Sequence, residues 1–117
     1  MKRLAYALLF LAAAAGAIYM AGLAVWQLWF FALAPDLTFL FAGGANLQKG
    51  QIRPRAVPLY NAAHSLIGPA LLAAVVLLLV GRGPWLAGAL AWAAHIAADR
   101  ASGFGPRAST GFQRSAP

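Results

Sequence analysis

The sequence contains no cysteine and only two acidic residues. The lack of cysteine excludes disulfides, thiolate metal ligands and thiol catalysis. The two acids, Asp36 and Asp99, and the only two histidines, His64 and His95, all lie in or at the edge of long apolar stretches. Ionisable side chains in hydrocarbon cost about 2.5–3.5 kcal/mol each, and they are kept where they pair, line a cavity or carry out a function. These four residues are therefore the first candidates for a functional site.

Charge of either sign is scarce: charged residues make up 9% of the 117 residues, whereas 62% are hydrophobic. This length allows one domain. The formal charge of +7 would suit a nucleic-acid-binding protein, but the nine basic residues fall in short groups between apolar runs. That distribution is typical of the cytoplasmic anchors of membrane proteins. The composition thus indicates an integral membrane protein whose partner is the lipid bilayer, and it argues against nucleic-acid binding.

The apolar runs divide into four predicted transmembrane helices. No charged residue occurs between Leu4 and Ala34, and a single helix of that length would measure about 46 Å, more than the ~30 Å hydrocarbon core. A turn near Ala21-Gly22 resolves the excess length, and Gly81-Arg82-Gly83 marks a second tight turn. We therefore predict an all-α fold, an integral membrane four-helix bundle. Its spans lie at about 4–20, 23–42, 57–80 and 84–101, followed by a polar cytoplasmic tail at 102–117 without regular structure.

The distribution of positive charge supports four spans with both termini in the cytoplasm. In this topology the amino terminus, the second loop and the tail share one side of the membrane and hold all the basic residues except Arg82. The asymmetry satisfies the positive-inside rule, which a three-span arrangement would break. One alternative stays open. Lys2-Arg3, the apolar stretch and the small residues near Gly16 also resemble a cleavable signal peptide, whose removal would leave three spans in the same orientation.

The four-span topology brings the rare ionisable residues to a similar depth in the membrane. At 1.5 Å per residue, Asp36, His64 and His95 lie about 9–10 Å from the cytoplasmic interface, and Asp99 lies about 3 Å from it. His95 and Asp99 are four residues apart, so they share one face of a helix. The sequence therefore predicts that three separate helices deliver these side chains to one polar cluster.

Other polar and small residues accompany the four. Asn61 precedes His64 by three residues, and Gly68 follows one turn later, where a small residue lets a neighbouring helix approach closely. Arg100 lies near the end of the fourth span, within reach of Asp36 or of lipid phosphates. The candidate polar cluster is therefore Asp36, Asn61, His64, His95, Asp99 and Arg100.

Two imidazoles and two carboxylates are a donor set that binds a divalent metal, Zn²⁺ tetrahedrally or Mn²⁺ and Fe²⁺ with added water. The candidate ligands are Asp36, His64, His95 and Asp99. With one position open, a bound water would be activated to attack the phosphoryl or acyl group of a lipid-like substrate. Two other interpretations stay open: a proton or ion transport component, and a purely structural polar network. The sequence selects no catalytic residue and leaves open whether copies form a homo-oligomer.

Three motifs carry a family resemblance: Ala34-Pro35-Asp36-Leu37, the segment 59–65 (LYNAAHS) and the segment 92–100 (WAAHIAADR). In this order they resemble domain-of-unknown-function family 4260, an uncharacterised family of small bacterial membrane proteins. The resemblance covers nearly the whole chain. It implies a multi-pass protein of the bacterial inner (cytoplasmic) membrane with no assigned activity. The His-Ser and His-x-x-x-Asp elements are also weakly similar to the membrane-bound metal-dependent hydrolases, which is an analogy of pattern only.

Two features of that family are missing from this chain. Members often carry a glutamate in the first span and an Asp-Thr-His sequence near the end of the tail. This chain has no acid in the first span, and its tail reads Gln113-Arg114-Ser115-Ala116. Either the site of this copy is impaired, or its ligand set is limited to the two histidines and the two aspartates.

Overall fold

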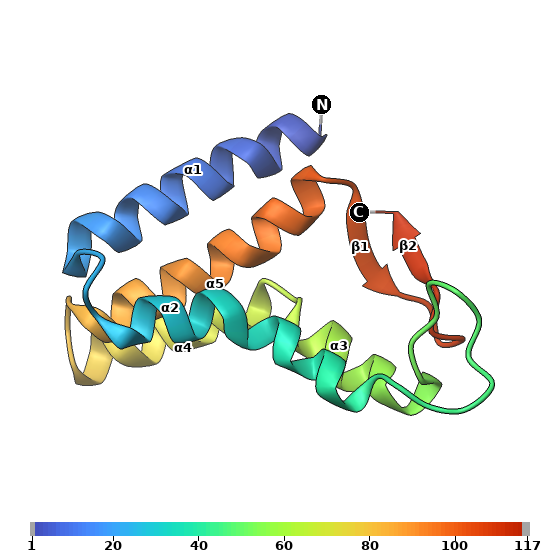
Figure 1. Ribbon diagram of the computed structural model, residues 1–117. Helices are drawn as coiled ribbons and strands as arrows, with labels where there is room; N and C mark the ends of the chain where they lie inside the picture. The colour runs from blue at the N-terminus through green and yellow to red at the C-terminus, as the bar shows by residue number, and fades with distance from the viewer. Residues whose placement is uncertain (1, 116–117) are drawn as a thin grey trace.

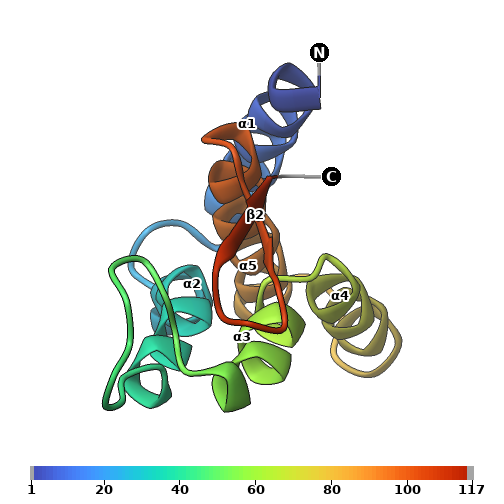
Figure 2. The ribbon, with the colours of Figure 1, turned by 90° about the vertical axis from the view of Figure 1, so that its right-hand side faces the viewer.

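The computed structural model describes residues 2–115, and it is mostly helical. The helix α5 (Pro84–Ala101) occupies the centre of the molecule (Figure 1). The helices α1 (Lys2–Ala21), α2 (Trp26–Leu33) and α4 (Ile67–Leu79) pack against it from different sides. Figure 2 shows this arrangement end-on, with α1, α2 and α4 spread around α5. The helical part of the predicted fold class is confirmed.

The second and third predicted spans are helical but broken. After α2 the chain continues as a 3-10 helix, η1 (Ala34–Phe41), because Pro35 has no N–H and its ring disfavours a continuous α-helix. The third segment consists of the short 3-10 helix η2 (Pro54–Ala56), then α3 (Val57–Ala63), then α4. Its axis bends by 43° between α3 and α4. The breaks fall beside Asp36 and at His64, two of the predicted site residues.

Within residues 2–115, one helix is long and apolar enough to cross a membrane, namely α1. The number rises to two if the bent pair formed by 54–63 and 67–79 is counted as one span. Length and composition of this kind are also found in signal sequences and in the core helices of soluble proteins, so they are weak support. The four-span membrane arrangement therefore stays a prediction.

The tail has regular structure, which the sequence reasoning did not expect. The strand β1 (Phe104–Arg107) pairs antiparallel with β2 (Gln113–Ser115). The loop before η2 also joins this hairpin, through a bridge between Gln51 and Phe112. The expectation of an irregular tail was wrong because the tail pairs with itself and is held by the distant loop, where Ile52 N donates to Gly111 O at 3.0 Å, and local Gly, Ser and Pro content does not reveal that contact.

Small residues allow the helices to approach α5 closely. A Cβ atom added at Gly68 would lie 2.5 Å from ring atoms of Trp92, and one added at Gly88 would lie 2.6 Å from the ring of Phe31. The expectation that Gly68 admits a neighbouring helix is confirmed. Close packing here brings α4 and α2 against α5. It thereby brings Asp36, which follows α2, and His64, which precedes α4, near the polar side chains of α5.

Candidate metal centre

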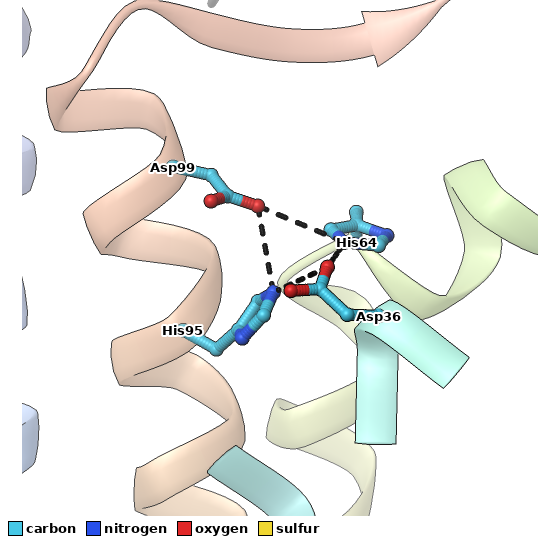
Figure 3. Close-up of side chains that lie close together, drawn as sticks. All are labelled: Asp36, His64, His95 and Asp99. Atoms are coloured by element: carbon cyan, nitrogen blue, oxygen red, sulfur yellow. Dashed lines mark hydrogen bonds and ion pairs between the residues drawn. The ribbon is translucent and has the colours of Figure 1, made fainter. Parts of the chain in front are cut away.

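Four ionisable side chains from three segments converge beside α5 (Figure 3). Asp36 lies in the first turn of η1, and His64 lies at the end of α3. His95 and Asp99 lie one turn apart on α5. One ligand atom from each residue can be chosen so that all four atoms lie within 4.8 Å of one another. The predicted convergence of the rare ionisable residues is therefore present in the structure.

The helix breaks place two of these side chains. Thr38 Oγ1 donates to Pro35 O at 2.8 Å, which ties the first turn of η1 around Asp36. His64 caps α3 with φ −105° and ψ 17°, outside the helical region. Its backbone N–H still donates to Tyr60 O at 3.0 Å. Both Asp36 and His64 thus lie where a regular α-helix ends, and their side chains contact those of α5.

Both imidazole rings are oriented by main-chain carbonyls. His64 Nδ1 lies 2.9 Å from Tyr60 O, and His95 Nδ1 lies 2.7 Å from Ala32 O. Because a carbonyl oxygen only accepts, each Nδ1 carries a proton and donates it. In the neutral ring, Nε2 then keeps its lone pair. Metal-binding histidines are oriented by the same kind of hydrogen bond at their second nitrogen.

The two Nε2 atoms face the same two carboxylate oxygens. His64 Nε2 lies 3.3 Å from Asp36 Oδ1 and 3.7 Å from Asp99 Oδ2. His95 Nε2 lies 3.2 and 3.5 Å from those same oxygens. Atoms that all carry lone pairs repel at such distances unless a proton or a cation lies between them. In a tetrahedral zinc site with bonds of about 2.0–2.2 Å, neighbouring ligand atoms are about 3.3 Å apart. The four nitrogen-to-oxygen distances, 3.2–3.7 Å, are close to that value.

His95 Nε2 is a buried polar atom of the cluster whose hydrogen-bonding capacity is not satisfied: among residues 2–115 it has no hydrogen-bond partner. Its 3.2 Å approach to Asp36 Oδ1 therefore does not supply a hydrogen bond. A buried polar atom without a partner costs about 1–3 kcal/mol. A cation between the rings and the carboxylates would remove that cost.

The histidines are buried and the carboxylates are reachable. The side chains of His64 and His95 are 6% and 11% exposed, whereas those of Asp36 and Asp99 are 53% and 34% exposed. His95 and Asp99 line a cavity of about 440 Å³, and Asp36 and Asp99 line a second one of about 360 Å³. A water molecule or a substrate can therefore reach the cluster from the side of the carboxylates.

Asn61 and Arg100, the other two members of the predicted polar cluster, make their hydrogen bonds elsewhere. Asn61 Nδ2 donates to Arg107 O at 2.9 Å, and its Oδ1 accepts from Arg107 N at 2.7 Å, so this side chain holds β1 against α3. Arg100 Nη1 donates to the hydroxyl of Tyr6 at 3.4 Å. Arg100 thus contacts α1, and of the two partners that the sequence suggested, Asp36 and lipid phosphates, it forms no ion pair with Asp36 within residues 2–115.

Tyr60 and Arg107 adjoin the cluster and were not predicted as site residues. The ring of Tyr60 stacks on that of His64, with centroids 4.0 Å apart and planes 18° apart. The guanidinium of Arg107 lies 5.2 Å from the centre of the Tyr60 ring. Tyr60 precedes His64 by four residues, so helical spacing contains a signal for it. Arg107 has no local signal, because the tail reaches the site only through the hairpin.

Residues 2–116 match the family described as Domain of unknown function (DUF4260), and the chain belongs to this family. No curated protein and no solved structure matches the chain significantly. The predicted family is therefore confirmed, while its description assigns no activity. The membrane location and the similarity to metal-dependent hydrolases stay predictions.

Proposed function

We propose that this chain is a small integral membrane protein of the bacterial inner membrane that binds one divalent metal ion, such as Zn²⁺. The ligands are Asp36, His64, His95 and Asp99. One observation carries the proposal: two Nε2 atoms, each oriented by a main-chain carbonyl at Nδ1, face the same two carboxylate oxygens at 3.2–3.7 Å. The donor set, its spacing and the buried, unpartnered His95 Nε2 all suit a cation at the centre.

Metal-assisted hydrolysis of a lipid-like substrate is the activity that this site suits. A bound divalent ion lowers the pKa of its water toward 7 and polarises the oxygen of an ester. For hydrolysis, the two histidines and one carboxylate would hold the ion, which leaves one position for water. The water oxygen would form a bond to the acyl carbon or phosphorus, and the other carboxylate would take its proton. The ester bond breaks, the departing alkoxide receives the proton, and an acid and an alcohol are released. The partial exposure of Asp36 and Asp99 leaves room for water and substrate.

The apolar outer faces of the helices support a membrane location. Leu8 on α1, Leu33 on α2 and Leu78 on α4 are 58%, 63% and 84% exposed. Extended apolar surfaces of this kind are rare on soluble monomers and are favourable in contact with lipid. The 20 residues of α1 would extend about 30 Å, the thickness of the hydrocarbon core.

The separation of charge supports the proposed orientation. The start of α1, the end of α5, the loop between η1 and η2 and the hairpin lie at one end of the molecule, and the two short turns lie at the other (Figure 1). Together with η2, which holds Arg55, those segments carry all the basic residues except Arg82, which lies in a short turn. By the positive-inside rule we place the basic end, with the metal cluster near it, at the cytoplasmic face.

Single cysteines test this orientation, since the chain has no cysteine of its own. In intact cells a membrane-impermeant maleimide should label the Arg82→Cys variant. It should label the Gln48→Cys variant, in the basic loop, only after permeabilisation. Equal labelling of both variants in intact cells would contradict the four-span orientation.

Metal analysis of detergent-purified protein tests the metal site. Wild type is expected to hold about one equivalent of a divalent metal, and the His64→Ala and His95→Ala variants are expected to lose it. The matched control is Leu78→Ala, which truncates a side chain on the outer face of α4 that is 84% exposed. The absence of stoichiometric metal in wild type would falsify the metal proposal.

A second candidate function is a proton or ion transport component. The same contacts of 3.2–3.7 Å fit a proton shared between an imidazole and a carboxylate, which needs no metal. The transport hypothesis predicts that metal-free protein reconstituted in liposomes conducts protons or ions, and that the Asp36→Asn variant does not. A purely structural role predicts instead that Asp36→Asn lowers thermal stability while flux and activity stay unchanged.

A further inference from the structure

The cluster lies between two cavities of opposite character. The first, the apolar cavity, lies between α1, α2 and α5 and measures about 440 Å³. Its lining is apolar or aromatic except for His95 and Asp99. The second, the polar cavity, measures about 360 Å³ and is lined by residues that include Asp36, Asp99, Arg107 and Gln113. Asp99 lines both, so the two cavities meet at the candidate metal ligands.

Alanines hollow out the apolar cavity and lead it to the cluster. Ala91 and Ala98 of α5 share the face of His95, and Ala94 of α5 and Ala14 of α1 line the same cavity. At the rim of the cavity, Leu23, Ile18 and Trp29 are 56%, 46% and 50% exposed. The cavity therefore opens on the apolar outer surface of the molecule. In the proposed orientation that surface faces lipid, so a hydrocarbon chain can enter from the bilayer.

The polar cavity is lined by one cationic side chain whose hydrogen-bonding groups are only partly used, that of Arg107. Arg107 Nη1 donates to Gly50 O at 2.9 Å and to Gly111 O at 3.1 Å. Its Nε is buried and has no hydrogen-bond partner within the described residues 2–115. With a divalent ion bound, the two carboxylates of the cluster are neutralised, and Arg107 leaves the region with a net positive charge. Such a cavity favours an anionic group such as a phosphate, whose oxygens match the geometry of the guanidinium donors.

We propose that the two cavities together bind a single-chain lipid phosphate, with its hydrocarbon chain in the apolar cavity and its phosphate in the polar cavity near Arg107. The inference rests on the proposed metal site and names the substrate class of that site, because the ester linkage then lies beside Asp99 and the ion. One cavity of about 440 Å³ takes one chain, within the range of about 300–1,000 Å³ found for small-ligand sites.

The test measures equilibrium binding of an oleoyl lysophosphatidate to wild-type protein in nanodiscs, against an oleoyl monoacylglycerol and against inorganic phosphate. The lysophosphatidate is expected to bind at least tenfold more tightly than either. This comparison uses only wild type, so no folding defect affects it. Equal affinity for the monoacylglycerol overturns the phosphate site, and equal affinity for inorganic phosphate overturns the chain site.

Two variants locate the two halves. Ala14→Phe fills the apolar cavity and is expected to weaken lysophosphatidate binding at least tenfold, while the matched Ala74→Phe on the exposed side of α4 leaves it unchanged. Arg107→Gln is expected to weaken the binding of the lysophosphatidate and to leave the binding of the monoacylglycerol unchanged. Arg107→Lys is expected to restore part of the lysophosphatidate affinity. Equal effects of Ala14→Phe and Ala74→Phe overturn the cavity assignment. Metal is measured on the same samples: bound metal without lipid selectivity defeats this inference only, whereas metal-free wild type defeats the proposed function.

Discussion

Replacing His95 by asparagine separates its role as a ligand from its role in packing. The imidazole Nδ1 donates to Ala32 O at 2.7 Å, and the amide nitrogen of an asparagine can occupy nearly the same position. The variant His95→Asn therefore keeps this hydrogen bond and loses only Nε2, the atom that faces the two carboxylates. If Nε2 binds a metal, metal affinity falls while the metal-free protein stays folded.

The expected loss of metal affinity in His95→Asn can be estimated from the number of ligands. Structural zinc sites with four ligands bind with about 10–16 kcal/mol, so one ligand accounts for about 2.5–4 kcal/mol. At 1.4 kcal/mol per factor of ten, this loss weakens metal binding by about 60- to 700-fold, or roughly 100-fold. When free metal is 100 times the wild-type Kd, wild type gains about 2.7 kcal/mol of stability. A variant that binds 100-fold more weakly gains about 0.4 kcal/mol at the same concentration.

The assay is unfolding of purified protein in detergent, with chelator alone and with buffered Zn²⁺. Wild type and the control Leu78→Ala are expected to gain stability with Zn²⁺, and His95→Asn to gain almost none. His64→Asn is a second test, because its amide can replace the Nδ1 donor to Tyr60 O. A full gain in both asparagine variants would refute the ligand assignment. No gain in wild type would refute the metal site itself.

Three other outcomes are expected. Gly68→Ala should destabilise the protein by about 1–3 kcal/mol in thermal unfolding, because its Cβ would lie 2.5 Å from the Trp92 ring, whereas Gly43→Ala, in open space, should not. Asn61→Ala removes both hydrogen bonds to the backbone of Arg107, at a cost of about 1–3 kcal/mol. It should speed tryptic cleavage of the tail, and unchanged proteolysis would contradict its anchoring role. Chelator should lower the melting temperature of wild type but not of the two histidine-to-alanine variants, and equal shifts would count against the site.

The broad organisation was predictable from local sequence. Apolar runs separated by Gly22 and by Gly81-Arg82-Gly83 correctly indicated helices that end near residues 21 and 80. The same runs did not reveal the breaks near Asp36 and at His64. Apolar composition alone cannot distinguish a continuous helix from two short ones, and at Pro35 the missing backbone donor decides the geometry.

The site was predictable as a set of residues but not as a geometry. Scarcity and helical spacing selected Asp36, His64, His95 and Asp99, and the structure brings these four together. Asn61 and Arg100 satisfied the same criteria of polarity and position, yet their hydrogen bonds go to Arg107 and Tyr6. Depth along a helix predicts which residues can meet. It does not predict which of them do.

The sequence by itself determined the helical character of the chain, its family and the scarcity of ionisable groups, because these depend on composition and on local periodicity. Tertiary structure alone decided that His95 Nδ1 donates to Ala32 O, that both Nε2 atoms face shared carboxylates, and that the tail hairpin lies beside them. Each of these contacts joins segments or orients a ring through packing around α5. No local pattern encodes that packing, since it depends on where helices bend and how closely small residues let them approach.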